Sequence, residues 1–132
     1  MPLPRKKILV VEDDLVDLMS ATLTIAQGGQ YDIVSAERGD QAVMLARKLT
    51  NLALVIMDIR LPGFGRIDAG IEAIERIREF APTLPILAIT AWGERLRGAA
   101  MAAGANAFLR KDAGTHEILR VVENLLGSGK GK

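Results

Sequence analysis

The sequence contains no cysteine and only one histidine, His116, among its 132 residues. Disulfides, thiolate metal sites, cysteine nucleophiles and multi-histidine zinc sites are therefore excluded. No apolar run approaches the roughly 20 residues that a membrane-spanning helix needs, and the N-terminus lacks the apolar core of a signal peptide. We therefore expect a soluble protein in the reducing environment of the cytoplasm, with no membrane partner.

Positive charge is scarce outside the two ends of the chain. The sequence has 17 basic and 16 acidic residues, a net charge of +1, but five of the basic residues lie in segments 5–7 and 130–132. The rest of the chain therefore carries 12 basic against 16 acidic residues. A nucleic-acid-binding surface needs the opposite sign, so DNA and RNA are not expected as direct ligands.

The length and composition predict one globular domain. Hydrophobic residues make up 49% of the sequence and charged residues 25%, which is typical of a soluble folded protein. We expect a short N-terminal extension at 1–5, a folded domain at 6–126 and a flexible Gly/Lys-rich tail at 127–132.

Two kinds of apolar pattern alternate along the domain. Short continuous apolar runs predict buried parallel strands at 8–11, 54–57, 86–89 and 107–109, with a weaker strand at 31–36. Stripes with helical spacing predict helices around 15–23, 42–49, 71–77 and 118–125. An alanine-rich segment predicts a further helix at about 93–103, which Gly104 would end. Parallel strands need crossovers that cover both faces of the sheet, so the pattern predicts an α/β fold with a doubly wound sheet of five strands and five helices.

Polar residues follow four of the predicted strands, at the edge where such sheets bind ligands. These residues are Glu12-Asp13-Asp14, Asp58, Thr90 and Arg110-Lys111. Each alone has a simple role as a helix cap, a turn former or a solvated charge. Together, crowded carboxylates repel one another unless a cation binds, and carboxylate oxygens suit Mg²⁺. With a lysine and a hydroxyl nearby, the residues predict a Mg²⁺-dependent carboxylate that accepts a phosphoryl group.

Four segments of the sequence resemble the receiver domain (CheY-like) of two-component response regulators. They are Ile8–Asp13, Ile56–Gly63, Ile89–Ala91 and Gly104–Lys111, and they occur in the family's order. The resemblance extends from about Lys6 to Leu126. It implies a flavodoxin-like fold with the strand order 2-1-3-4-5 and a role in phosphorelay signal transduction.

The resemblance also implies roles for the acidic residues. Asp58 matches the phosphoacceptor, which attacks the phosphohistidine of a sensor histidine kinase or a phosphotransfer protein. Glu12 and Asp13 match the pair that holds Mg²⁺ together with Asp58 and the backbone carbonyl of Arg60. On this interpretation the protein forms and loses an acyl phosphate but is not an enzyme that turns over an external substrate.

Three further residues match the switch of the family. Lys111 matches the lysine that pairs with the phosphoryl oxygens, and Thr90 matches the hydroxyl that moves to bond them. Phe108 matches the switch aromatic, whose ring turns inward as Thr90 moves. The readout face implied by the resemblance comprises the fourth helix, fifth strand and fifth helix, which would contact an output domain or effector protein. The sequence leaves open whether phosphorylation also drives homodimerisation.

Several positions are individual to this chain. The loop at 63–69 is longer than the family usually has, and it is either a tolerated insertion or a means for Phe64 or Arg66 to cover Asp58. Trp92 follows Thr90 closely enough to flank the site. Asp112 stands where the family often has proline, and it could cap the last helix.

Other functions fit the sequence less well. A receiver-like module that binds a partner without phosphorylation is the main alternative, but the intact acidic residues, Thr90 and Lys111 count against it. A phosphatase with an aspartyl nucleophile usually needs a second aspartate where Arg60 stands. A flavin-binding relative would bind phosphate where Glu12 and Asp13 would repel it.

Overall fold

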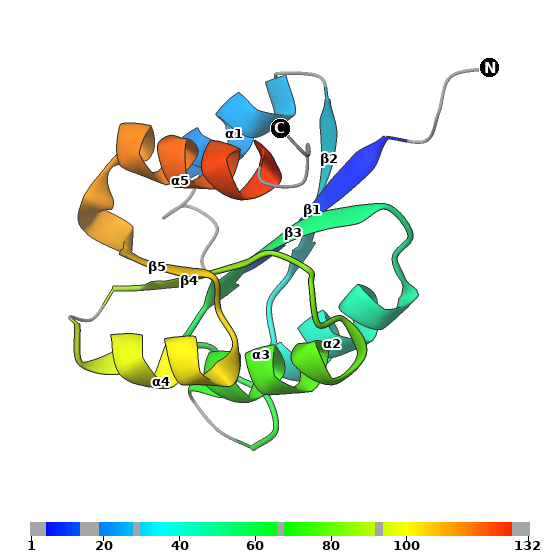
Figure 1. Ribbon diagram of the computed structural model, residues 1–132, viewed down its shortest axis with the longest axis vertical. Helices are drawn as coiled ribbons and strands as arrows, with labels where there is room; N and C mark the ends of the chain where they lie inside the picture. Colours follow the sequence, from blue (N-terminus) through cyan, green and yellow to red (C-terminus); the bar gives the residue numbers. More distant parts are fainter. Residues whose placement is uncertain (1–4, 14–18, 28–29, 66–67, 92–93, 128–132) are drawn as a thin grey trace.

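A five-stranded parallel sheet forms the centre of the computed structural model, which describes residues 5–13, 19–27, 30–65, 68–91 and 94–127. Its strands are β1 (Lys6–Val11), β2 (Tyr31–Ala36), β3 (Leu52–Asp58), β4 (Ile86–Thr90) and β5 (Ala107–Arg110). Their order in the sheet is β2-β1-β3-β4-β5 (Figure 1), which confirms the predicted order. The order of connection reverses at β1 and β3, and the crevice of a doubly wound sheet lies beyond the carboxyl ends of such strands.

Helices cover both faces of this sheet. One face carries α1 (Met19–Gln27) and α5 (Thr115–Gly127), and the other carries α2 (Gly39–Lys48), α3 (Ala69–Phe80) and α4 (Arg97–Ala103) (Figure 1). Two short 3₁₀ turns, η2 (Glu94–Leu96) and η3 (Lys111–Ala113), precede α4 and α5. Within the ranges that the structure describes, no helix is long and apolar enough to cross a membrane.

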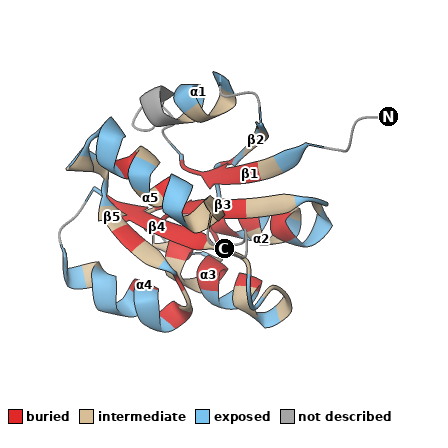
Figure 2. Ribbon diagram, turned by 45° about the horizontal axis from the view of Figure 1, so that its top comes forward, coloured by how far each residue is buried: buried red, intermediate tan, exposed pale blue. Residues whose placement is uncertain are grey.

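The core has two parts because successive side chains of a strand point to opposite faces of the sheet. The central strands β1, β3 and β4 are buried along most of their length (Figure 2). Leu9, Val55 and Met57 belong to the cluster under α2, α3 and α4. Ile8 and Leu54 belong to the cluster under α5. Burial on both faces fixes the register of the strands, and hence the alignment of the residues that follow them.

The structure changes one predicted helix boundary and one predicted helix cap. The segment expected as one helix from residue 93 begins with the 3₁₀ turn η2, and its α-helix starts only at Arg97. It ends before Gly104 as predicted, with a φ of 122° at that glycine. The proposal that Asp112 caps α5 is wrong, because Asp112 lies inside η3 and its carboxylate accepts a 2.7 Å hydrogen bond from Arg110. The beginning of the first predicted helix, at 15–18, lies outside the described residues.

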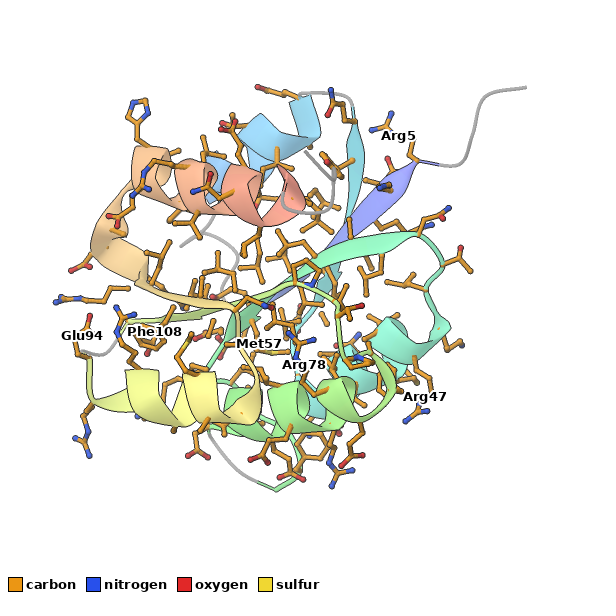
Figure 3. The ribbon with its side chains drawn as sticks, viewed as in Figure 1. Arg5, Arg47, Met57, Arg78, Glu94 and Phe108 are labelled. Atoms are coloured by element: carbon orange, nitrogen blue, oxygen red, sulfur yellow. The ribbon has the colours of Figure 1, made fainter. Side chains whose placement is uncertain are left out.

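Arg78 joins the end of α3 to the segment between α4 and β5. Its guanidinium donates hydrogen bonds to the carbonyl oxygens of Gly104 (2.9 Å) and Ala81 (2.8 Å) and to the Asn106 side chain (2.7 Å). The same Asn106 oxygen accepts the backbone N–H of Ile86 at the start of β4 (2.8 Å). Arg78 lies among these elements in Figure 3. These bonds fix the end of α4 that is nearer Gly104.

Candidate functional site

The predicted site residues meet at the carboxyl edge of the sheet. Glu12 directly follows β1, Asp58 ends β3, Thr90 ends β4 and Lys111 follows β5. Glu12, Asp58 and Thr90 are at most 1% exposed, and they are the buried polar or charged residues of the described part of the chain. Burial of polar groups is costly, so their concentration at one edge makes this edge the candidate functional site.

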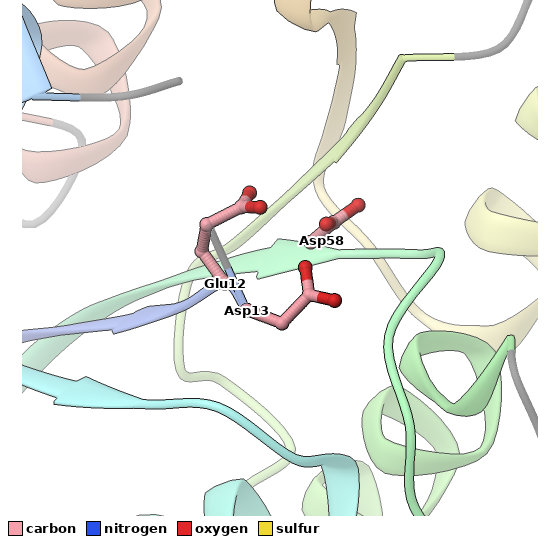
Figure 4. Close-up of side chains that lie close together, drawn as sticks. All are labelled: Glu12, Asp13 and Asp58. Atoms are coloured by element: carbon pink, nitrogen blue, oxygen red, sulfur yellow. The ribbon is translucent and has the colours of Figure 1, made fainter. Parts of the chain in front are cut away.

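Three carboxylates converge at this edge. The side chains of Glu12, Asp13 and Asp58 point toward one another (Figure 4), with one carboxylate oxygen of each within 4.8 Å of the others. Glu12 and Asp58 are buried, whereas Asp13 is exposed to solvent. The Asp58 carboxylate also accepts a 3.2 Å hydrogen bond from the backbone N–H of Arg60, which brings the backbone of Arg60 to the site.

The ammonium group of Lys111 lies between the two buried carboxylates. Its Nζ is 2.8 Å from the carboxylate of Glu12 and 3.0 Å from Oδ2 of Asp58. Burial alone would lower the pKa of Lys111, but the hydrogen bonds and charges of Glu12 and Asp58 outweigh it and raise this pKa. Lys111 therefore stays protonated at neutral pH.

Burial has the opposite consequence for Asp58. It raises the pKa of the Asp58 carboxyl, although Lys111 and the N–H of Arg60 act to lower it. With all groups ionised, three carboxylates face a single ammonium, and the site carries two negative charges in excess. The donors are all oxygens, one carboxylate is exposed to solvent, and a divalent cation would neutralise the excess. This donor set fits Mg²⁺, which is held by one or two carboxylates and keeps several water or phosphate ligands.

Gly70 supports the site and was not identified from the sequence. Its N–H donates to the carbonyl oxygen of Ile59 (3.1 Å), and a Cβ at this position would overlap the backbone carbonyl of Asp58. The start of α3 can therefore pack directly on the strand end that carries Asp58. A glycine within a helix lowers the stability of the helix by about 1 kcal/mol relative to alanine. A glycine at the start of a predicted helix was therefore the sign in the sequence that another backbone approaches closely there.

The loop after Asp58 packs away from the carboxylate. Phe64 has a φ of 54°, and its ring lies 4.4 Å from the guanidinium of Arg76 on α3 and against Gly39 of α2. The backbone N–H of Gly39 also donates to the carbonyl oxygen of Pro62 (2.8 Å). The hypothesis that Phe64 covers Asp58 is therefore wrong, and the ring instead anchors the loop to α2 and α3. Asp14, Arg66 and Trp92, which were also considered from the sequence, lie outside the described residues.

The two predicted switch residues lie on adjacent strands. Phe108 of β5 pairs in register with Ala88 of β4, and Arg110 pairs with Thr90. The ring of Phe108 is 4% exposed and belongs to the core on the α4 side of the sheet. Phe108 is therefore in an inward position, three residues before Lys111.

Comparison with known proteins gives one consistent match. The sequence profile described as "Response regulator receiver domain" matches residues 8–123. Transcriptional regulatory protein YdfI of Bacillus subtilis is 33% identical over 119 residues, which are 89% of this chain and 53% of that protein. Two-component system protein A of Emericella nidulans is 31% identical over 95% of this chain and 18% of its own length. The chain thus spans about half or less of these two relatives.

A solved structure shares both the fold and part of the sequence. The receiver domain of the sensor histidine kinase PA1611 from Pseudomonas aeruginosa superimposes with a TM-score of 0.79 at 29% identity, covering 94% of this chain and 99% of that one. That structure holds a magnesium ion in its active-site cleft.

Proposed function

Because this chain belongs to the response regulator receiver family, we propose that it transmits a signal by accepting a phosphoryl group on Asp58 with the help of Mg²⁺. The donor is the phosphohistidine of a sensor histidine kinase or of a phosphotransfer protein, and the reaction takes place in the cytoplasm. The protein acts as a phosphoacceptor rather than as an enzyme with an external substrate.

The position of the Asp58 carboxylate carries this proposal. It ends a central strand, 3.0 Å from the ammonium of Lys111 and within 4.8 Å of two further carboxylates. A nucleophilic oxygen, a fixed cation and an oxygen-rich metal site thus occupy one edge of the sheet. This combination is what phosphoryl transfer needs, since its catalysis consists mainly of positioning and charge stabilisation.

The residues of the chain divide the reaction among them. An oxygen of Asp58 attacks phosphorus while the bond from phosphorus to the histidine nitrogen breaks, and the imidazole leaves with its electron pair. Glu12, Asp13, Asp58 and the backbone carbonyl of Arg60 would hold Mg²⁺, which when bound neutralises charge on the phosphoryl oxygens. Lys111 supplies the second positive charge from its place beside Asp58. Attack of water on the acyl phosphate returns the carboxylate and inorganic phosphate.

The new charge at Asp58 then changes the neighbouring strands. A phosphoryl group adds about −1.5 to −2 charges and three acceptor oxygens, which attract the Thr90 hydroxyl and Lys111. Movement of Thr90 toward the phosphoryl group, with the Phe108 ring held inward, alters the face formed by α4, β5 and α5, where an output domain or effector protein binds. The altered face can also bind a second copy of the chain, so that phosphorylation would lead to homodimerisation.

Incubation with acetyl phosphate and Mg²⁺, followed by intact mass measurement, tests the proposal. The wild-type chain should gain the mass of one phosphoryl group, and the gain should vanish in Asp58→Asn and in excess chelator. Asp32→Asn is the matched control, because Asp32 is an exposed aspartate of β2 that forms an ion pair with Arg5 and lies outside the site. Absence of a gain in the wild type, with a folded protein, would favour the phosphorylation-independent interaction module instead.

A further inference from the structure

A direct side-chain contact joins the beginning of α4 to β5. The guanidinium carbon of Arg97, the first residue of α4, lies 4.9 Å from the centroid of the Phe108 ring. Glu94 and Phe108 both lie near this end of α4 in Figure 3. A guanidinium within about 6 Å of an aromatic centroid is attracted to the ring face, so Arg97 favours the buried position of Phe108.

Glu94 holds Arg97 in place over the ring. Two guanidinium nitrogens of Arg97 donate to the two carboxylate oxygens of Glu94, and the longer of these bonds measures 3.2 Å. A cation at the first position of a helix opposes the helix dipole, so Arg97 is not placed there to stabilise α4 itself. Its two contacts, with Glu94 and with Phe108, account for its position better than helix stability does.

The ring of Phe108 borders a cavity that could receive it. This cavity has a volume of about 320 Å³, and Arg97, Phe108, Arg110 and Ala113 are among the residues that line it. A tightly filled core would leave the ring no second position, whereas this cavity offers one on the α4–β5–α5 side. Lys111 follows Phe108 by three residues, so a shift of the ring acts on the same short segment that carries the ammonium of the site.

We infer that Arg97 is a positioning residue that holds Phe108 in its buried position before phosphorylation, and that Phe108 otherwise moves into the cavity. One part of the inference rests on the proposed function, namely that burial of the Phe108 ring favours phosphorylation of Asp58 and that phosphorylation favours burial of the ring. Linkage is reciprocal, so weakening the Arg97 contact lowers the fraction of chains ready for phosphorylation. A cation–π contact at a half-exposed arginine corresponds to an equilibrium shift of about two- to fivefold.

Fluorine NMR on protein labelled with 4-fluorophenylalanine tests the position of the ring. The chain has three phenylalanines, and Phe108→Leu identifies the resonance of Phe108. In the unphosphorylated protein, Arg97→Ala should raise the solvent exposure of this resonance about two- to fivefold, and Arg97→Lys should restore part of the burial. Arg95→Ala is the matched control, because Arg95 is an exposed arginine in the adjacent turn η2. An exposure in Arg97→Ala equal to that of the control would overturn the inference.

The rate of phosphorylation by acetyl phosphate and Mg²⁺ provides the second measurement. Arg97→Ala should react more slowly than Arg95→Ala at an unchanged melting temperature, and its rate should fall by the same factor as the buried fraction of Phe108 that the fluorine signal reports. Equal rates would overturn the link between ring position and phosphorylation. If neither the wild type nor any variant is phosphorylated while the fluorine signal of Phe108 still responds to Arg97→Ala, the proposed function fails and the positioning role stands.

Discussion

Replacement of Asp58 by asparagine is expected to stabilise the metal-free protein. The amide has the shape of the carboxyl group and keeps an oxygen that can accept a hydrogen bond from Lys111, but it removes one of three negative charges from the site. The usual expectation for a substitution of a buried residue is the opposite, a loss of stability.

The distances in the site allow an order-of-magnitude estimate. At an effective dielectric constant of about 20, the 3.0 Å contact with Lys111 favours the Asp58 charge by about 5 kcal/mol. Repulsion from Glu12, within 4.8 Å, opposes it by about 3 to 4 kcal/mol, and the exposed Asp13 adds about half as much. The attraction to Lys111 and the repulsion from the two other carboxylates nearly cancel. What remains is the free-energy cost of burying the charged carboxylate, which exceeds the cost of burying a neutral amide by about 2 kcal/mol.

Thermal unfolding in the presence of a chelator measures this difference. In a chain of this size, each kcal/mol of unfolding free energy shifts the melting temperature by about 4 °C. We therefore expect Asp58→Asn to melt about 8 °C above the wild type at neutral pH. The raised pKa of Asp58 means that the folded state binds the proton more tightly than the unfolded state, whose pKa is 3.8. The advantage of the variant should therefore be absent below this value and grow as the pH rises through the folded-state pKa.

Addition of Mg²⁺ should reverse the comparison, because a ligand that binds only the folded wild type stabilises it. A variant that is less stable than the wild type in chelator at neutral pH would refute the argument. An advantage that did not change with pH would refute it equally, because the charge of Asp58 would then not be its cause.

Two further substitutions test other parts of the site. Lys111→Met should lower the free energy of unfolding in urea by about 3 to 5 kcal/mol, because it leaves Glu12 and Asp58 buried without their shared cation; an unchanged midpoint would contradict this. The raised pKa of Lys111 further predicts that the wild type keeps this stabilisation below pH 10.5 and loses it as the pH rises through the folded-state pKa, whereas the variant shows no such loss. Phe64→Ala should cost about 1 to 2 kcal/mol of stability but leave the rate of dephosphorylation unchanged, and a changed rate would place the ring nearer Asp58 than we find.

The meeting of Glu12, Asp58 and Lys111 was predictable from the sequence because it depends on topology alone. Glu12 and Lys111 follow apolar runs that are too short for a helix, and Asp58 ends another; the strands that carry Glu12 and Asp58 are buried along most of their length. Once the strands are parallel, their carboxyl ends share one edge of the sheet. The residue types then indicated oxygen ligands and a phosphoryl acceptor without any knowledge of distances.

The features that the sequence did not predict depend on packing between distant segments. Phe64 turns toward Gly39 and Arg76 because the missing side chain of Gly39 leaves room for its ring, and no local pattern contains that information. The contact of Arg97 with Phe108 depends on how η2 sets the start of α4 relative to β5. The alanine-rich composition predicted that α4 exists but could not distinguish its first turn from a 3₁₀ turn.

Reduction of the phosphorylated protein with borohydride, followed by peptide mass spectrometry, tests the central claim most directly. Borohydride converts an aspartyl phosphate to homoserine and leaves free carboxylates intact, so it marks the acceptor residue. We expect homoserine at position 58 after treatment with acetyl phosphate and Mg²⁺, and unchanged aspartate there when Mg²⁺ is removed by chelator. Homoserine at another position, or none at position 58 in the presence of Mg²⁺, would contradict the account.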